Sequence, residues 1–279
     1  MIEKYYNGVI EQVAGGIGNV EHNSILVRYS NDFSIWDLES VNHYKDQTDI
    51  FFTCHEFSYN KIAEAYEPYL GLIRQMFHKY CSGTLEEFME ECDVYKLQRP
   101  VFESYFEKGF CERTEQILID EVEYEQERMR NSIVTMLQKL SEIRPVVIVL
   151  NRFQLASKST MQLSNSLLQV KNKNIGIVLG VNDVQSIPEF AHEEWDAICE
   201  SMDDRNMVYH IGNAGRNMEP DVMDYYSDYE SDDGYRKLNN LVYFLDFDQA
   251  NHHLSKIERR IKFDNFTISE KKHYQLLLL

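Results

Sequence analysis

The chain has 279 residues, of which 43% are apolar, and its formal net charge is −18. The length and the apolar fraction exclude an intrinsically disordered chain and are sufficient to bury a substantial core. The acidic excess would repel nucleic-acid backbones and anionic lipid head groups, so this segment is expected to bind neither nucleic acid nor a membrane surface.

The cysteines and the apolar runs indicate the compartment. Five cysteines at wide spacings, without a C-x-x-C pair, disfavour a disulfide framework or a cysteine zinc site and favour free thiols. The start of the chain shows no apolar leader, and no window holds about 18 consecutive apolar residues. We therefore expect a cytoplasmic protein without a membrane span.

The first part of the chain predicts two strands. The glycine cluster at 15–18 precedes the first strand, so it predicts a plain turn, because a phosphate-binding turn should follow a strand. Residues 24–29 and 50–54 are short apolar runs, and the polar stretch 30–48 between them predicts a turn and a short helix. Strand, connection and strand at this spacing are typical of a parallel crossover unit.

Helices are predicted next. Apolar residues recur at helical spacing over 61–80, where Pro68 is placed to begin the regular part of the helix. Thr84 and Glu87 stand three residues apart and predict a capping box that opens a short helix. Two further helices are expected over about 99–110 and 113–119.

The stretch from 128 to 183 carries the clearest pattern. An amphipathic helix ends at Pro145, and the run 146–150 that follows is aliphatic throughout. A second helix, over about 159–170, leads to another such run at 175–179. Continuous apolar runs are typical of strands covered on both faces, and the alternation of helix and strand predicts an α/β fold in three layers, with a parallel sheet flanked by helices.

The pattern weakens beyond the second run. Residues 208–211 predict an edge strand. The acidic stretch 217–236 predicts an exposed loop, because its glycine falls one place too late for an EF-hand calcium loop and Asn239 stands where a bidentate glutamate is needed. From about 237, two amphipathic stripes predict helices like those that open a helical-repeat array, and Ser269 is placed to cap a last one.

These elements predict three parts. Residues 1–215 form an α/β domain, residues 216–236 an acidic loop or linker, and residues 237–279 a C-terminal all-helical segment that begins an array of repeats. The chain ends on four leucines without a cap, so we expect a continuation beyond it.

The residues from Pro145 to Thr160 resemble the second nucleotide motif (Walker B) of the STAND ATPases, signal-transducing regulators related to the AAA+ class. In that family four apolar strand residues precede two acidic residues, whose positions are taken here by Asn151 and Arg152. Thr53–Phe57 resembles the family's second strand, and Asn182 stands where a sensor residue usually ends the next strand. The resemblance implies a P-loop NTPase-like sheet, ATP and Mg²⁺ as ligands, and tetratricopeptide-like repeats after the helical segment.

Both phosphate-handling motifs of that family are altered. A P-loop needs glycines around the phosphates and a lysine that reaches them, but residues 28–37 contain neither, and Asp32 and Asp37 would repel a triphosphate. At the second motif Asn151 lacks the negative charge that compensates Mg²⁺, and Arg152 places a cation where the family has an acid. We therefore expect no ATP hydrolysis, no catalytic residue and no metal site.

The favoured function is a non-catalytic regulatory or protein-interaction domain of a larger bacterial signalling protein. Such a pseudo-ATPase would need no cofactor and would work through protein partners or self-association. The alternative is an atypical ATP-binding STAND-type ATPase that acts as a nucleotide-dependent switch with ATP and Mg²⁺. A third hypothesis is a structural domain that self-associates through its aromatic surface. Under the ATP alternative, the nucleotide-binding residues are Ser30, Asn31, Ser34, Asn151 and Asn182.

Overall fold

The computed structural model describes most of the chain. The described residues are 2–19, 23–30, 34–45, 47, 49–58, 61–111, 122–182, 187, 189–204, 207–211 and 232–262, with side chains of the last range described from 233 to 257. Several predicted features lie outside these residues, namely the helix over 113–119, the cap at Ser269, Asn31 of the ATP alternative and most of the acidic stretch.

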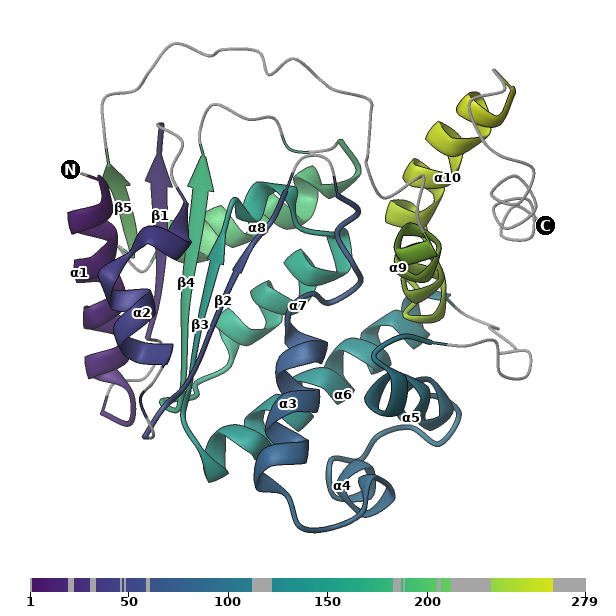
Figure 1. Cartoon of the computed structure of the whole chain (residues 1–279), viewed down its shortest axis with the longest axis horizontal. Coiled ribbons are helices and arrows are strands. Elements are labelled where there is room, and N and C mark those ends of the chain that lie inside the picture. The colour runs from purple at the N-terminus through teal and green to yellow at the C-terminus, as the bar shows by residue number, and fades with distance from the viewer. Residues whose placement is uncertain are drawn as a thin grey trace.

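Five parallel strands form one sheet in the order β2-β3-β4-β1-β5 (Figure 1). The runs at 146 and 175 are neighbours, with Val146 beside Ile175. The predicted three-layer α/β fold is therefore confirmed, and the all-parallel sheet is consistent with a P-loop NTPase-like architecture. The strands are β1 (Ser24–Tyr29), β2 (Phe51–Glu56), β3 (Val146–Asn151), β4 (Ile175–Asn182) and β5 (Val208–Ile211).

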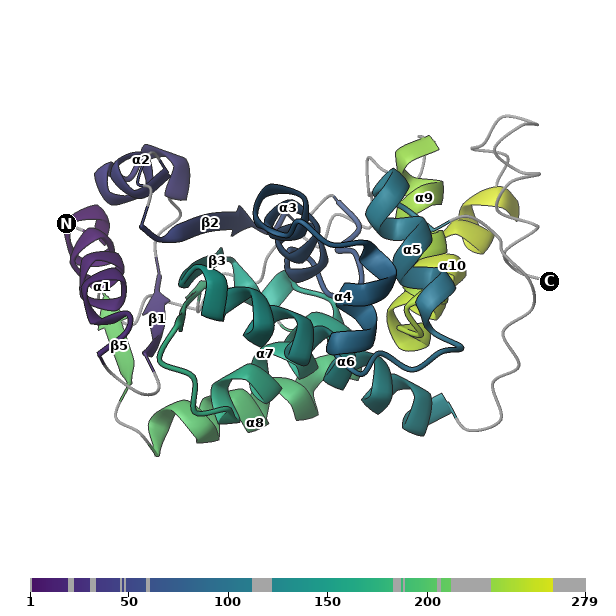
Figure 2. The ribbon, with the colours of Figure 1, turned by 90° about the horizontal axis from the view of Figure 1, so that it is seen from below.

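Helices cover both faces of the sheet, because the central strands are apolar on both faces. On β3, Val149 packs into the hydrophobic cluster of one helical layer, whereas Ile148 packs into the cluster of the other. The two layers lie on opposite sides of the sheet in Figures 1 and 2. The first layer is α1 (Ile2–Gly16) and α2 (Glu39–Lys45); the second is α3 (Tyr69–Tyr80), α6 (Val122–Ile143), α7 (Lys158–Gln169) and α8 (His192–Asp203).

The N-terminal helix α1 is a correction to the sequence analysis, which predicted only a turn at 15–18. Gly15 and Gly16 lie in the last turn of α1, and Gly18 adopts the turn with a φ of 83°. The helix can approach the sheet closely because β4 carries Gly176, where a Cβ would lie 2.5 Å from Cγ1 of Val13. The side chains that α1 buries are Tyr6, Val9, Ile10, Val13 and Ala14.

The predicted capping box is confirmed. The N–H of Glu87 donates to Oγ1 of Thr84 at 3.2 Å, and the N–H of Thr84 donates to Oε2 of Glu87 at 2.8 Å. Two free N–H groups of the first turn are thereby satisfied. The box opens α4 (Leu85–Glu91), and the predicted α5 (Arg99–Lys108) follows.

Other boundaries differ by a few residues. α3 begins at Tyr69 with Pro68 as its N-cap, so the predicted role of Pro68 at the start of the regular helix is confirmed, whereas residues 61–67 are not part of the helix. β2 and β4 run past their predicted ends, to Glu56 and Asn182. β5 is the predicted edge strand, and among the described strands it pairs only with β1. None of the helices among the described residues is long and apolar enough to cross a bilayer.

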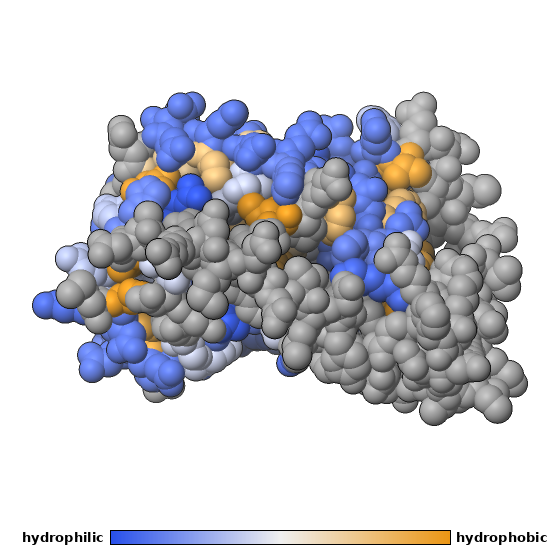
Figure 3. Space-filling view, turned by 90° about the horizontal axis from the view of Figure 1, so that it is seen from above, coloured by the Kyte–Doolittle hydropathy of each residue, from blue (hydrophilic) through white to orange (hydrophobic). Residues whose placement is uncertain are grey.

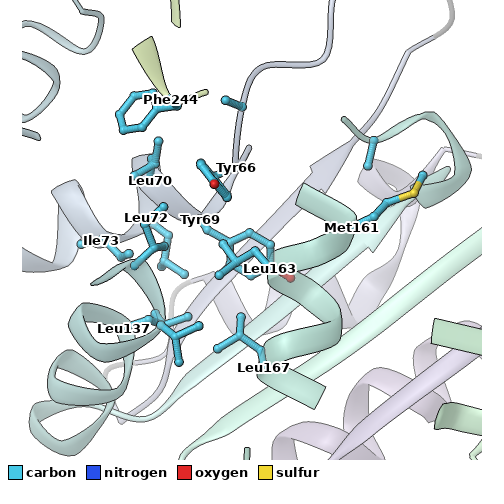
Figure 4. Packing of buried hydrophobic residues seen from close by; sticks show 14 of the residues in the cluster. Tyr66, Tyr69, Leu70, Leu72, Ile73, Leu137, Met161, Leu163, Leu167 and Phe244 are labelled. Carbon is cyan, nitrogen blue, oxygen red and sulfur yellow. The ribbon is translucent and has the colours of Figure 1, made fainter. Parts of the chain in front are cut away.

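Two C-terminal helices, α9 (Asp232–Tyr243) and α10 (Phe247–Lys262), pack against the second layer. α9 begins at Asp232, so helix replaces the end of the predicted acidic loop. The buried side chains of both helices belong to the same hydrophobic cluster as the sheet. Phe244 lies in this junction beside Tyr66 and Leu70 (Figure 4), with its ring centroid 6.1 Å from that of Tyr66.

A buried carboxylate joins the C-terminal helices to the α/β domain. Asp246 accepts the N–H of Ser159, in the first turn of α7, at 2.9 Å. It also accepts the N–H of Gln249, in the first turn of α10, at 3.3 Å. One side chain therefore caps the amino ends of two helices from different parts of the chain.

Candidate functional site

The carboxyl ends of four strands bring polar side chains to one edge of the sheet. Tyr29 ends β1 beside Asn182 of β4, and Glu56 ends β2 beside Asn151 of β3. In open α/β sheets this edge is where ligands bind. Figure 3 looks onto this end of the molecule, where the described surface is mostly hydrophilic with scattered apolar residues.

Asn151 is completely buried and uses both ends of its carboxamide within the protein. Its Oδ1 accepts the hydroxyl of Tyr29 at 2.7 Å, and its Nδ2 donates to Oε1 of Glu56 at 3.3 Å. The ring of Tyr29 stands edge-on to that of Tyr6 from α1, with centroids 6.4 Å apart. Tyr29 of β1 therefore contacts Asn151 directly, and Tyr6 of α1 packs on Tyr29.

Glu56 is the common partner of this network. Besides the bond from Asn151, Oε1 of Glu56 lies 3.6 Å from Nε of Arg152, and Oε2 accepts the hydroxyl of Ser34 at 3.3 Å. Arg152 directly follows the buried strand β3, and its backbone is left-handed, with a φ of 52°. The carboxylate is thus compensated by an arginine of the same chain.

The amino end of α2 is the place where a P-loop helix would hold phosphate. Here the N–H of Ser40 donates to Oδ1 of Asn7 at 3.0 Å, and the Ser40 hydroxyl donates to the same oxygen at 2.6 Å. Glu39 adds negative charge to the same turn. An amide oxygen from α1 therefore takes the position in which an anion would be needed.

Two residues of the ATP alternative are brought together. Ser34 and Asn151 both donate to the carboxylate of Glu56, one to each oxygen. Since both are engaged with a protein carboxylate, neither presents the arrangement that a nucleotide phosphate or its Mg²⁺ requires.

Among the other residues of that alternative, Ser30 and Asn182 are described. The backbone N–H of Asn182 donates to Oε1 of Gln154 at 3.2 Å, and both residues are buried. Ser30 directly follows β1 and is half-buried. Asn31 belongs to the residues that the structure does not describe.

Sequence reasoning missed Tyr6, Asn7, Glu56 and Gln154. Gln154 was visible only as part of the Walker B resemblance, and Glu56 lay beyond the expected end of its strand. Tyr6 and Asn7 come from the helix that the sequence did not predict. The apolar stripe of that helix, at spacings of three and four residues, was the signal that would have found it.

A second polar cluster lies where the loop before α3 meets α9. Oε2 of Glu64 accepts Nδ2 of Asn240 at 2.8 Å, and Oε1 of Glu67 lies 3.4 Å from Nε2 of His55. Burial, followed by the charge of Glu67, raises the pKa of Glu64 to about 7. Burial, followed by the charge of Lys237, lowers the pKa of His55 to about 4. In the described part of the chain, no group of three His, Cys, Asp or Glu is placed to hold a metal ion.

We expect the substitution Glu64→Gln to change how stability depends on pH. Folding raises the pKa of Glu64 from its ordinary 4.5 to about 7, so the folded chain holds the proton more tightly and loses this stabilisation as the pH rises between those values. Glu64→Gln should leave the free energy of unfolding unchanged near pH 4 and raise it by about 1 to 3 kcal/mol above pH 7. Urea denaturation of both proteins across this range measures the difference.

The comparison between the two proteins also cancels the opposite slope from His55, whose pKa is lowered on folding. Glu103→Gln, at an exposed position of α5, serves as the control and should show no pH-dependent difference. A Glu64→Gln difference that stays constant across the pH range would contradict the assignment.

Gly180 on β4 is expected to be sensitive to a single methyl group. A Cβ there would clash with the hydroxyl of Tyr6 and lie 2.7 Å from Oδ1 of Asn151. Gly180→Ala should lower the free energy of unfolding by about 1 to 3 kcal/mol, and Tyr6→Phe in the same chain should recover part of the loss. A double-mutant cycle in urea measures this coupling. Gly8→Ala, with no atom within 4 Å of its new Cβ, is the control, and additive effects at 180 and 6 would refute the contact.

Among the described residues, the strand-end network thus consists of contacts between the chain's own side chains, joined by Glu56 and Asn151. The chain matches no protein-family model, no curated protein and no solved structure.

Proposed function

We propose that this chain is a non-catalytic regulatory or protein-interaction domain, in which the protein's own side chains occupy the place of a nucleotide. The observation that carries the proposal is the state of Asn151. It stands at the position of the magnesium acid, yet it is 0% exposed and hydrogen-bonded to Tyr29 and Glu56. A Mg²⁺ ion keeps several waters when it binds a nucleotide, and such an ion cannot reach a buried amide.

The phosphate end of the site supports the same conclusion. The first turn of α2 already receives Asn7, and Glu39 opposes an anion there. Glu56 already binds the hydroxyl of Ser34, which lies shortly before this turn in the chain. Nucleotide binding would therefore require the removal of α1 from the sheet.

The wider role follows from the resemblance to STAND regulators. The domain is proposed to act in a cytoplasmic bacterial signalling protein, as a pseudo-ATPase, with a helical-repeat region after α9 and α10. Its contribution would be to bind protein partners in place of switching on nucleotide.

Isothermal titration calorimetry of the full chain with ATP, ADP and their Mg²⁺ complexes tests the proposal. We expect no binding with a Kd below about 1 mM and no release of phosphate. Thermal unfolding gives a second readout, because a nucleotide at about 100 times its Kd would stabilise the fold by about 2.7 kcal/mol. Micromolar binding, or a stabilisation of that size, would contradict the proposal and favour an ATP-dependent switch.

A further inference from the structure

β2 is an edge strand of the sheet, and no other described strand pairs with its outer side. The N–H of Phe51 donates to the carbonyl of Pro145 at 2.7 Å, so this residue turns its backbone groups towards β3. Backbone groups alternate along a strand, and Phe52 and Cys54 therefore turn theirs away from β3. Within the described residues, none forms a backbone hydrogen bond with Phe52 or Cys54 on that side. Such a row of donors and acceptors is the template for strand addition.

A groove lies at the amino end of this edge. It has a volume of about 570 Å³ and lies between the residues that end α2 and the last turns of α3. Figure 2 shows β2 running between these two helices. Its lining includes apolar and basic side chains, namely Ile50, Phe51, Tyr80, Lys45, Arg74 and Lys79.

The charge of the groove is opposite to that of the whole chain. Three of its ten lining residues are Lys or Arg and none is Asp or Glu, whereas Lys and Arg account for 28 of the 279 residues. No carboxylate among the described residues forms an ion pair with Lys45, Arg74 or Lys79. Arg74 is oriented by the backbone carbonyl of Phe106, which accepts its Nε at 2.6 Å. The groove is therefore suited to an acidic occupant.

We propose that the open edge of β2 and this basic groove bind an extended acidic segment of a partner protein, which adds to the sheet as a strand beside β2. The inference rests on the proposed protein-interaction function and names its surface. Backbone bonds to Phe52 and Cys54 hold the segment, while its carboxylates pair with Lys45 and Lys79. A second copy of the chain is a poorer occupant, because pairing two β2 edges brings together two chains of charge −18.

An octapeptide of alternating glutamate and valine is the probe, and the lysine–valine octapeptide is its reversed-charge control. We expect the acidic peptide to bind the full chain about tenfold more tightly than the basic one, with affinity falling as salt is added. Amide hydrogen exchange read by NMR should slow about tenfold at Phe52 and Cys54 when the acidic peptide saturates the chain. The amides of Phe51 and Thr53, which face β3, should not change.

Charge reversal tests the groove without disturbing the core. Lys45 and Lys79 are exposed, and the double substitution Lys45→Glu with Lys79→Glu should weaken the acidic peptide about tenfold. Lys171→Glu with Lys173→Glu changes the net charge equally at another exposed place and should leave binding unchanged. Equal binding of the two peptides, or unchanged exchange at Phe52 and Cys54, would overturn the inference. So would protection of these amides by self-association without peptide.

The two proposals fail in different experiments. If neither the peptide nor a nucleotide binds, the proposed binding surface at β2 is refuted and the pseudo-ATPase proposal remains. If ATP binds with micromolar affinity and the peptide slows amide exchange at Phe52 and Cys54, the pseudo-ATPase proposal is refuted and the proposed binding surface at β2 remains.

Discussion

Replacing Asn151 by aspartate is expected to lower the free energy of unfolding by about 3 to 5 kcal/mol at neutral pH, without creating a Mg²⁺ site. The new carboxylate would be completely buried and would face Glu56 in place of a donor, 3.3 Å from its Oε1. Arg152 is already close to Glu56 and cannot compensate both charges. Aspartate is the residue type that a nucleotide site has at this position, yet here it would disrupt the hydrogen bonds of residue 151 with its neighbours.

Urea denaturation and Mg²⁺ calorimetry measure the two parts of this prediction. The loss of stability should shrink at about pH 5, because a protonated aspartate can again donate to Glu56. Asn131→Asp, at an exposed position of α6, is the matched control and should be close to neutral. If the Asn151→Asp chain kept its stability and bound Mg²⁺ with micromolar affinity, the strand-end network would be able to admit a metal ion, and the prediction would be wrong.

Replacing Asp246 by alanine is expected to cost about 2 to 4 kcal/mol of stability. The substitution leaves the N–H groups of Ser159 and Gln249 without their acceptor at two buried helix starts. Burial raises the pKa of Asp246, so removal of a desolvated carboxylate offsets part of the loss. The C-terminal helices should also detach earlier in urea than the sheet, since their buried polar link to α7 is gone.

Asp248→Ala is the matched control for this experiment. Asp248 lies two residues away, is exposed, and pairs with Lys158 at 2.6 Å. Exposed ion pairs contribute about 0 to 1 kcal/mol, so this change should be nearly neutral. Equal effects of the two substitutions in urea would show that Asp246 does not act as a double cap.

The central part of the fold could be predicted because its signal is local. The runs at 146–150 and 175–179 are apolar at every position, or nearly so, and only a strand buried on both faces explains two such short runs separated by a helix. α1 was missed for a local reason too. Gly8, Gly15 and Gly16 reduce helix propensity, so the local signal for this helix is weak, and the glycine cluster at 15–18 predicted only a turn.

The site could be predicted only in part. Asn151 and Asn182 come directly after the apolar runs of two buried strands, and the sequence therefore places them at one edge of a parallel sheet. The partner of Asn151 could not be found in the same way, because Tyr29 reaches it across more than a hundred residues of chain. Gly180 held a usable signal, since an isolated glycine inside a buried strand indicates close approach by another group.

Through Asp246, the start of α10 is hydrogen-bonded to the same side chain as the start of α7. A rotation of α10 that keeps both hydrogen bonds must carry Ser159 and the first turn of α7 with it. α7 follows β3 after a short connection, so the displacement reaches the strand end at Asn151. Asp246 therefore ties the position of the C-terminal helices to the turn that connects β3 to α7.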